Sequence, residues 1–127
     1  MNILESTGVV KFDGFHFSFL VISRKEEFDF FIKENKLEKT KLADAWDKSQ
    51  GAVFTLRNSS GSTKHFIMLL QQPTLDTIMH ESVHMVHELM NRKGIPINYD
   101  NSEIMAYLTT YASMQVLKHV NGEANYE

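Results

Sequence analysis

Apolar and polar residues follow different periods along the chain, and each period predicts an element. Residues 15 to 23 combine aromatic and β-branched residues with partial alternation, which favours a strand with a buried face. Two further β-rich runs, residues 51 to 57 and 64 to 70, are separated by the turn-forming sequence Asn-Ser-Ser-Gly-Ser-Thr. These two runs predict a hairpin, so we expect about three strands.

Two helices are predicted in the first half of the chain. Ser23 precedes Glu26 by three residues, as in a capping box, and apolar residues then recur at helical spacing. We therefore expect a helix over residues 24 to 34. A shorter helix is expected over residues 41 to 48, where the apolar residues again share one face.

The second half of the chain predicts two longer helices. Apolar residues recur at helical spacing over residues 73 to 93, beginning at a proline that suits a first turn. Gly94 follows and can adopt the left-handed conformation that ends a helix. A last helix is expected to begin after Asp100 or Asn101 as its N-cap and to end at Gly122.

Composition narrows the class of protein. The 127 residues are 43% hydrophobic and 23% charged, which predicts a single globular domain over residues 1 to 127. The net charge of −3 disfavours a nucleic-acid partner, and no apolar run is long enough to span a membrane. The N-terminal residues do not resemble a secretory signal, so we expect a cytoplasmic protein. Because cysteine is absent, any metal must be held by histidine and carboxylate.

The predicted helix over residues 73 to 93 contains His80-Glu81-Ser82-Val83-His84, the H-E-x-x-H pattern of zinc sites. Four residues advance a helix by roughly 6 Å and turn it by about 400°, so both imidazoles can reach one Zn²⁺. Glu81 lies about 100° round the helix, where it can take a proton from a zinc-bound water that attacks a carbonyl. The structural alternative is two surface histidines and a solvated glutamate.

A catalytic zinc needs a third protein ligand and an open position. His87 lies roughly 10 Å along the axis from the first histidine, too far to join both. The metzincin pattern needs a glycine and a histidine where the chain has His87 and Met90. A carboxylate on the next helix remains, and we predict Glu103, nineteen residues after His84, as the third ligand. Alternatively, Glu103 is the back-reaching member of a capping box begun by Asp100.

Two tyrosines follow Glu103 by one and two helical turns. Tyr107 or Tyr111 could donate a hydrogen bond to the oxyanion that forms during peptide hydrolysis. The alternative for each is an aromatic ring half-buried between helices. His87 has a similar pair of interpretations, a group that binds substrate or water and a partly buried helix residue.

The motif and the segment Asn101-Ser102-Glu103-Ile104-Met105-Ala106-Tyr107-Leu108 together resemble the gluzincin type of zinc metallopeptidase. The likeness covers residues 73 to 112 and is nearest to small zincin-like proteins of bacteriophages. Tyr107 stands where the gluzincin glutamate helix usually carries an aspartate. The resemblance implies a minimal α+β zincin fold, whose edge strand lines a cleft for an extended peptide. Residues 64 to 70 are our prediction for that strand.

These observations predict a zinc metallopeptidase that acts on a peptide or protein substrate. The ligands are expected to be His80, His84 and Glu103, and Glu81 the general base. The main alternative is a non-catalytic zinc-binding or protein-interaction module on the same scaffold, for example a phage counter-defence factor. A further alternative is a metal-free structural protein.

Overall fold

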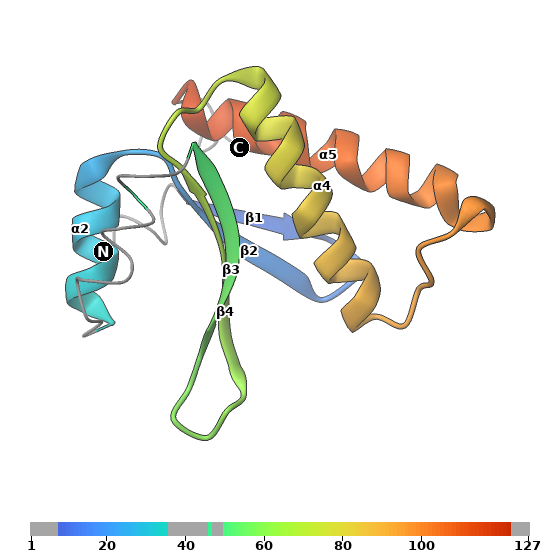
Figure 1. The fold of residues 1–127 in the computed structure, drawn as a ribbon, viewed down its shortest axis with the longest axis horizontal. Coiled ribbons are helices and arrows are strands. Elements are labelled where there is room, and N and C mark those ends of the chain that lie inside the picture. The colour runs from blue at the N-terminus through green and yellow to red at the C-terminus, as the bar shows by residue number, and fades with distance from the viewer. Residues whose placement is uncertain (1–7, 36–45, 47–49, 123–127) are drawn as a thin grey trace.

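The described part of the chain forms an α+β fold. The structure is a computed structural model and describes residues 8–35, 46 and 50–122. Its strands lie in one four-stranded sheet with helices on both faces (Figure 1). The elements in chain order are β1 (Val9–Phe12), β2 (Phe17–Ile22), α2 (Lys25–Glu34), β3 (Gly51–Arg57), β4 (Thr63–Leu70), α4 (Leu75–Arg92), the 3-10 turn η1 (Tyr99–Asn101) and α5 (Ser102–Val120).

The sheet is mixed, with the strand order β1-β2-β4-β3. Strands β1 and β2 form one antiparallel hairpin, and β3 and β4 form the other. The two hairpins are joined by a short parallel pairing of β2 with β4, from Leu20 opposite Ile67 to Ile22 opposite Leu69. The edges of the sheet are therefore β1 and β3.

The expectation of three strands is wrong, because β1 was not predicted. It has four residues, too few for a clear period, and it alternates between exposed and buried positions. The strand predicted over residues 15 to 23 is also shorter, because Gly14 and His16 lie in the connecting turn with φ of 87° and 50°. The run of aromatic residues therefore crosses a turn that the sequence pattern did not reveal.

The predicted hairpin over residues 51 to 57 and 64 to 70 is confirmed, but the edge assigned to it is wrong. Strand β4 pairs with β2 on one side and with β3 on the other, so it presents no free edge beside the helix that follows it. The strand with a free edge there is β3. Four consecutive β4 residues, Ile67 to Leu70, have no exposed surface, as expected of a strand covered on both faces.

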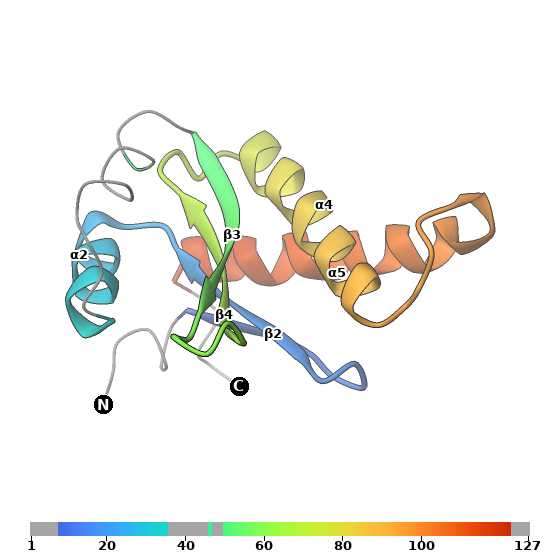
Figure 2. The same ribbon diagram turned by 60° about the horizontal axis from the view of Figure 1, so that its bottom comes forward.

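Two apolar cores lie on opposite faces of this sheet (Figure 2). On one face α4 and α5 cover Val21, Met68 and Leu70. On the other face α2 covers Ile22 and Leu69, so neighbouring residues of one strand enter different cores. The ring of Trp46 stacks on Phe28 of α2 at 4.8 Å between centroids. Apart from Trp46, the helix predicted over residues 41 to 48 lies outside the described residues.

The long helix α4 follows the prediction closely. Its N-cap is Thr74, whose side chain accepts a hydrogen bond from the Thr77 N–H, so the preceding proline lies before the cap and not in the first turn. The helix ends at Arg92, and Gly94, with φ of 70°, follows its C-cap as the predicted stop. The Ile95 N–H then donates to the carbonyl oxygen of Met90 at 2.8 Å and completes the C-terminal cap.

The last helix, α5, begins after Asn101 and ends at Asn121-Gly122, within the predicted range. Asp100 is not its N-cap, because this residue lies inside the preceding 3-10 turn. Among the helices that the structure describes, none is long and apolar enough to cross a membrane.

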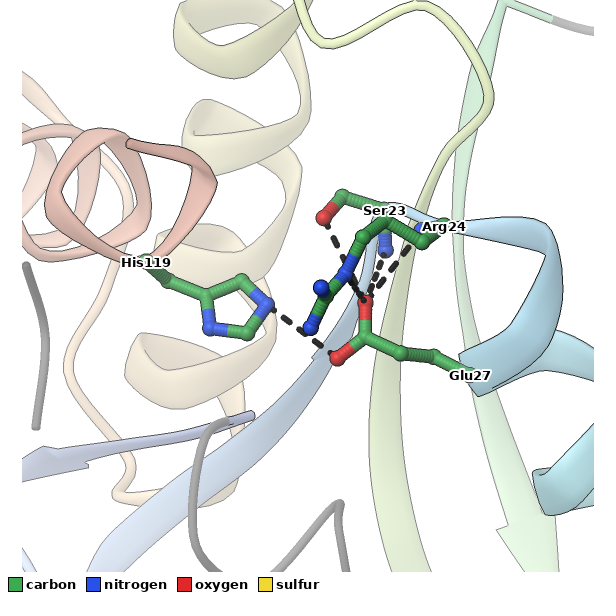
Figure 3. A network of polar contacts seen from close by, with 4 residues as sticks. All are labelled: Ser23, Arg24, Glu27 and His119. Carbon is green, nitrogen blue, oxygen red and sulfur yellow. Dashed lines mark hydrogen bonds and ion pairs between the residues drawn. The ribbon is translucent and has the colours of Figure 1, made fainter. Parts of the chain in front are cut away.

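A buried carboxylate connects α2 to α5 (Figure 3). Helix α2 begins one residue later than predicted, so Glu27 and not Glu26 reaches back to the N-terminus. One Glu27 oxygen accepts hydrogen bonds from the Ser23 and Arg24 N–H groups, both at 3.2 Å. The other oxygen lies 3.4 Å from Nε2 of His119, in the last turn of α5. Neither side chain is more than 4% exposed, so this contact lies in the interior.

Burial alone raises the pKa of Glu27, but His119, the Ser23 N–H and Arg24 outweigh it and lower that pKa below its ordinary value of 4.5. A carboxyl group with a lowered pKa stabilises the fold above its unfolded-state pKa. This stabilisation disappears as pH falls through the folded-state pKa. The Glu27 contribution is therefore present at neutral pH and is lost in acid below about pH 4.5.

We expect Glu27→Gln to lower the free energy of unfolding by about 3 kcal/mol at pH 7, because it removes the charge that the buried His119 faces. Urea denaturation measures this change. Asp29→Asn is the matched control on the same helix. Its pair with Lys25 is half-exposed and should contribute less than about 0.5 kcal/mol. Equal losses in the two variants would contradict the assignment, as would an unchanged acid dependence in Glu27→Gln.

Candidate functional site

Helix α4 presents the two histidines of the predicted motif on the side that faces away from the core. Its apolar face is buried against the sheet and includes Ile78, Met85 and Leu89, none of which has exposed surface. His80 and His84 lie on the exposed side of the helix. The 3.6-residue period that buries the apolar face therefore also holds both imidazoles outside it.

The two imidazoles lie together. The ring centroids of His80 and His84 are 4.9 Å apart, and the rings meet edge to face at 69°. The His80 side chain is 69% exposed, so ligand access is open. The two histidines are therefore neighbouring and accessible side chains of the kind that binds zinc.

Glu81 differs from its neighbours in being buried, with 6% of its surface exposed. Its Oε2 atom lies 4.0 Å from Nε2 of His80, so the carboxylate is directed toward the histidine pair. Cγ and the same Oε2 atom of Glu81 lie against Gly51, the first residue of β3. Glu81 thus occupies the junction between the helix and the edge of the sheet.

A cleft of about 640 Å³ follows this junction. A second cavity of about 420 Å³ continues it toward the N-terminus of α4, and the two cavities share Gly51, His80 and Glu81. The cleft is lined on one side by the start of β3 and on the other by α4, through Gly51, Ala52, Val53, His80, Glu81, His84 and His87. The predicted base therefore lies in the middle of a continuous hollow along the free edge of the sheet.

The structure does not bring Glu103 to the histidine pair. Glu103 is exposed in the first turn of α5, and it does not line either cavity. Figures 1 and 2 show the N-terminal half of α5 projecting beyond α4. Within residues 8–35, 46 and 50–122, no three acidic, histidine or cysteine side chains form a group that could hold a metal ion. The third ligand therefore stays a prediction.

The predicted tyrosines also lie elsewhere. Tyr107 and Tyr111 line a separate pocket of about 160 Å³, which includes Phe12 and the turn that follows β1. The Tyr111 hydroxyl donates a hydrogen bond to the carbonyl oxygen of Lys11 at 2.8 Å. Its ring packs on Phe12 with 5.5 Å between centroids. This placement agrees with the alternative of an aromatic ring packed between elements.

Sequence reasoning missed the contribution of β3 to the site. The cleft is lined by Gly51, Ala52 and Val53, whereas the sequence pattern predicted residues 64 to 70 as the edge strand beside it. A signal for it was present, because a glycine within a strand pattern often marks the close approach of another element. Here that element is α4.

Comparisons with protein-family models, with curated proteins and with solved structures find no match to this chain. Its function is therefore argued from the site geometry and from the motif that it contains.

We expect Tyr111→Phe to lower the free energy of unfolding by about 1 kcal/mol, because it removes the hydrogen bond to Lys11. Urea denaturation measures this loss, and Tyr107→Phe is the control because Tyr107 is 73% exposed. Neither change should alter zinc uptake. A loss of turnover of about 10²-fold or more in Tyr111→Phe, without the loss of stability, would instead favour the oxyanion role.

Proposed function

We propose that this protein is a zinc-dependent metallopeptidase. One observation carries the proposal. Two exposed histidines, with 4.9 Å between their ring centroids, lie beside a buried glutamate that points at one of them. The pair lies in a cleft bounded by a strand with a free edge. Ligands, a base and a surface for an extended chain are therefore adjacent.

The donors in the cleft suit zinc in chemistry and in spacing. Neutral imidazoles from positions four apart on one helix are established zinc ligands, and both rings are accessible. Together they would supply two of the three protein ligands of a catalytic site. We propose Glu103 as the third ligand because it follows the motif on the next helix, nineteen residues after His84. A separate variant tests this ligand.

Each residue then has a distinct role. Zinc, when bound, lowers the pKa of a coordinated water toward neutrality and polarises a carbonyl. Glu81 is too far round the helix to share the histidines' direction, but its Oε2 atom is directed toward the same space. Its carboxylate would accept the proton released when water attacks the peptide carbonyl, and would pass that proton to the leaving amine.

The substrate class follows from the edge strand. Strand β3 pairs with β4 on one side only, so the N–H and C=O groups on its other side can form main-chain hydrogen bonds with an extended peptide. The hollow continues on both sides of Glu81. We therefore propose that a peptide binds along β3, with an internal peptide bond beside Glu81.

The general architecture of the fold also supports the proposed function. A small twisted sheet, a helix with the H-E-x-x-H motif and an edge strand beside it are the parts that a minimal zincin requires. The gluzincin and phage resemblance of the motif region is consistent with these parts. We propose the zincin identity on that basis.

One observation favours a second candidate function. Because Glu103 stands apart from the histidines, the described residues bring only two of the predicted ligands together, and two ligands would bind a metal weakly. A protein-interaction module on the same scaffold would need no third ligand. Metal content and turnover distinguish the two candidates.

We expect the purified protein to bind one zinc per chain, as measured by plasma mass spectrometry and by competition with a chelator. His80→Ala and His84→Ala should each lower the affinity strongly, because each removes one of few anchoring donors. Glu103→Gln should also lower it if Glu103 is the third ligand.

Glu88→Gln is the matched control, since Glu88 lines the cleft but pairs with Arg92 at 3.0 Å. Unchanged affinity in both histidine variants would contradict the zinc site. Unchanged affinity in Glu103→Gln alone would remove only the third ligand.

We expect Glu81→Gln to keep its zinc and its fold but to lose turnover by roughly 10²-fold to 10⁴-fold, because an amide cannot accept the proton at neutral pH. A search for new N-termini in a proteome digest would first identify a cleavable peptide. Equal cleavage by Glu81→Gln and the parent would refute the peptidase mechanism. Zinc binding without any cleavage would favour the interaction module.

A further inference from the structure

Gly51 lies unusually close to α4. A Cβ atom built on Gly51 would fall 2.9 Å from Cγ2 of Thr77, 3.0 Å from Cγ of Glu81 and 3.2 Å from Oε2 of Glu81. Real Cβ atoms essentially never approach another atom as closely as the 2.9 Å to Thr77, and the two distances to Glu81 are tighter than nine in ten Cβ contacts. Any residue larger than glycine at this position would therefore displace α4, β3 or the Glu81 side chain.

The backbone at Gly51 does not itself require glycine. Gly61 and Gly94 have positive φ and lie in turns, whereas Gly51 is not among the residues with positive φ. Gly51 also pairs in regular register with Leu70 of β4. An alanine would fit this backbone, so the reason for a glycine is the space that its missing side chain leaves.

The neighbours of Gly51 have little freedom to move aside. Thr77 is 7% exposed and β-branched, and its hydroxyl lies 3.0 Å from the hydroxyl of Thr74. Glu81 is 6% exposed, and it supplies the other two atoms that an added methyl group would meet. Because Thr77 is restrained, an added methyl group would shift Glu81.

The affected oxygen is the one that matters for the site. Oε2 of Glu81 is the atom beside Gly51, and it is also the atom 4.0 Å from Nε2 of His80. Gly51 is in addition the strand residue common to both cavities of the cleft. It therefore borders the predicted base on the side of the sheet edge.

We infer that Gly51 is a positioning residue, whose missing side chain lets β3 pack against Glu81 and holds that carboxylate toward His80. The inference rests on the proposed function for the role of Glu81, but the contact itself does not. Displacing a catalytic group by about 1 Å can cost about 10²-fold in rate. Gly51 thus adds to the site by keeping Glu81 in place.

The first test measures the contact by thermal unfolding of the full chain. Gly51→Ala is made in three backgrounds, the parent, Glu81→Gln and Glu81→Ala. Without a contact, this change at an ordinary φ should raise Tm slightly. With it, Tm should fall by about 5 °C in the parent and in Glu81→Gln, which keeps the same shape. The fall should be at most half as large in Glu81→Ala, and equal falls in all three backgrounds would overturn the inference.

The second test separates positioning from stability and needs no substrate. In the metal-free protein, NMR should show that Gly51→Ala shifts the His80 ring signals more than those of His84. The same change in the Glu81→Ala background should leave the His80 signals where they were. Thr77→Ser, which removes only the methyl group nearest Gly51, should restore part of the parent spectrum. An unmoved His80 in Gly51→Ala would overturn the positioning role.

The third test measures the rate of peptide cleavage once a substrate is known. Gly51→Ala should lower kcat by about 10²-fold with zinc affinity unchanged. Parent-like kcat together with a lowered Tm would make Gly51 a purely structural residue and would overturn the inference. If Glu81→Gln proves as active as the parent, the proposed function fails, whereas the Tm cycle still reports the contact between Gly51 and Glu81.

Discussion

The parallel pairing between β2 and β4 determines where everything else lies. It joins residues Leu20, Val21 and Ile22 to Ile67, Met68 and Leu69 and so unites two separate hairpins in one sheet. All but Leu20 have no exposed surface. Because this pairing occupies one side of β4, only β3 is left with a free edge beside α4. The cleft exists where it does because β4 is central.

The same strand also sets the direction of the motif. Strand β4 ends at Leu70 and α4 begins at Leu75, so few residues separate them. The apolar face of α4 must cover the sheet, which fixes the rotation of the helix about its axis. His80 and His84 then project away from the core and Glu81 projects toward β3. Core packing therefore orients the candidate ligands.

Elements determined by short stretches of sequence could be predicted. The hairpin needs only two β-rich runs and a turn between them, and α4 needs only its period and Gly94. The strand order could not be predicted in this way, because it depends on residues far apart in the chain. A local signal for the position of β4 was nevertheless present. The unbroken apolar run from Ile67 to Leu70 is typical of an internal strand and not of an edge.

The candidate site likewise has a part that local sequence predicts and a part that depends on contacts between distant segments. His80 and His84 lie together because one helix carries both, and helix geometry alone predicts this. The distance from Glu103 to them depends instead on how α5 crosses α4, which is set by packing around Ala112 and Val116. Likewise, the carbonyl that accepts the Tyr111 hydrogen bond belongs to Lys11, 100 residues earlier. No spacing within the last helix contains that information.

Exposure differs sharply between the candidate ligands and the candidate base. The His80 side chain is 69% exposed and the Glu81 side chain 8%, although they are adjacent in sequence. An exposed ligand can be reached by a metal and a substrate, whereas a buried base has few alternative rotamers. In the mechanism that we propose, the group that restrains Glu81 is the backbone of β3 at Gly51, and the same strand would pair with the peptide. Substrate binding and base positioning would therefore share one strand.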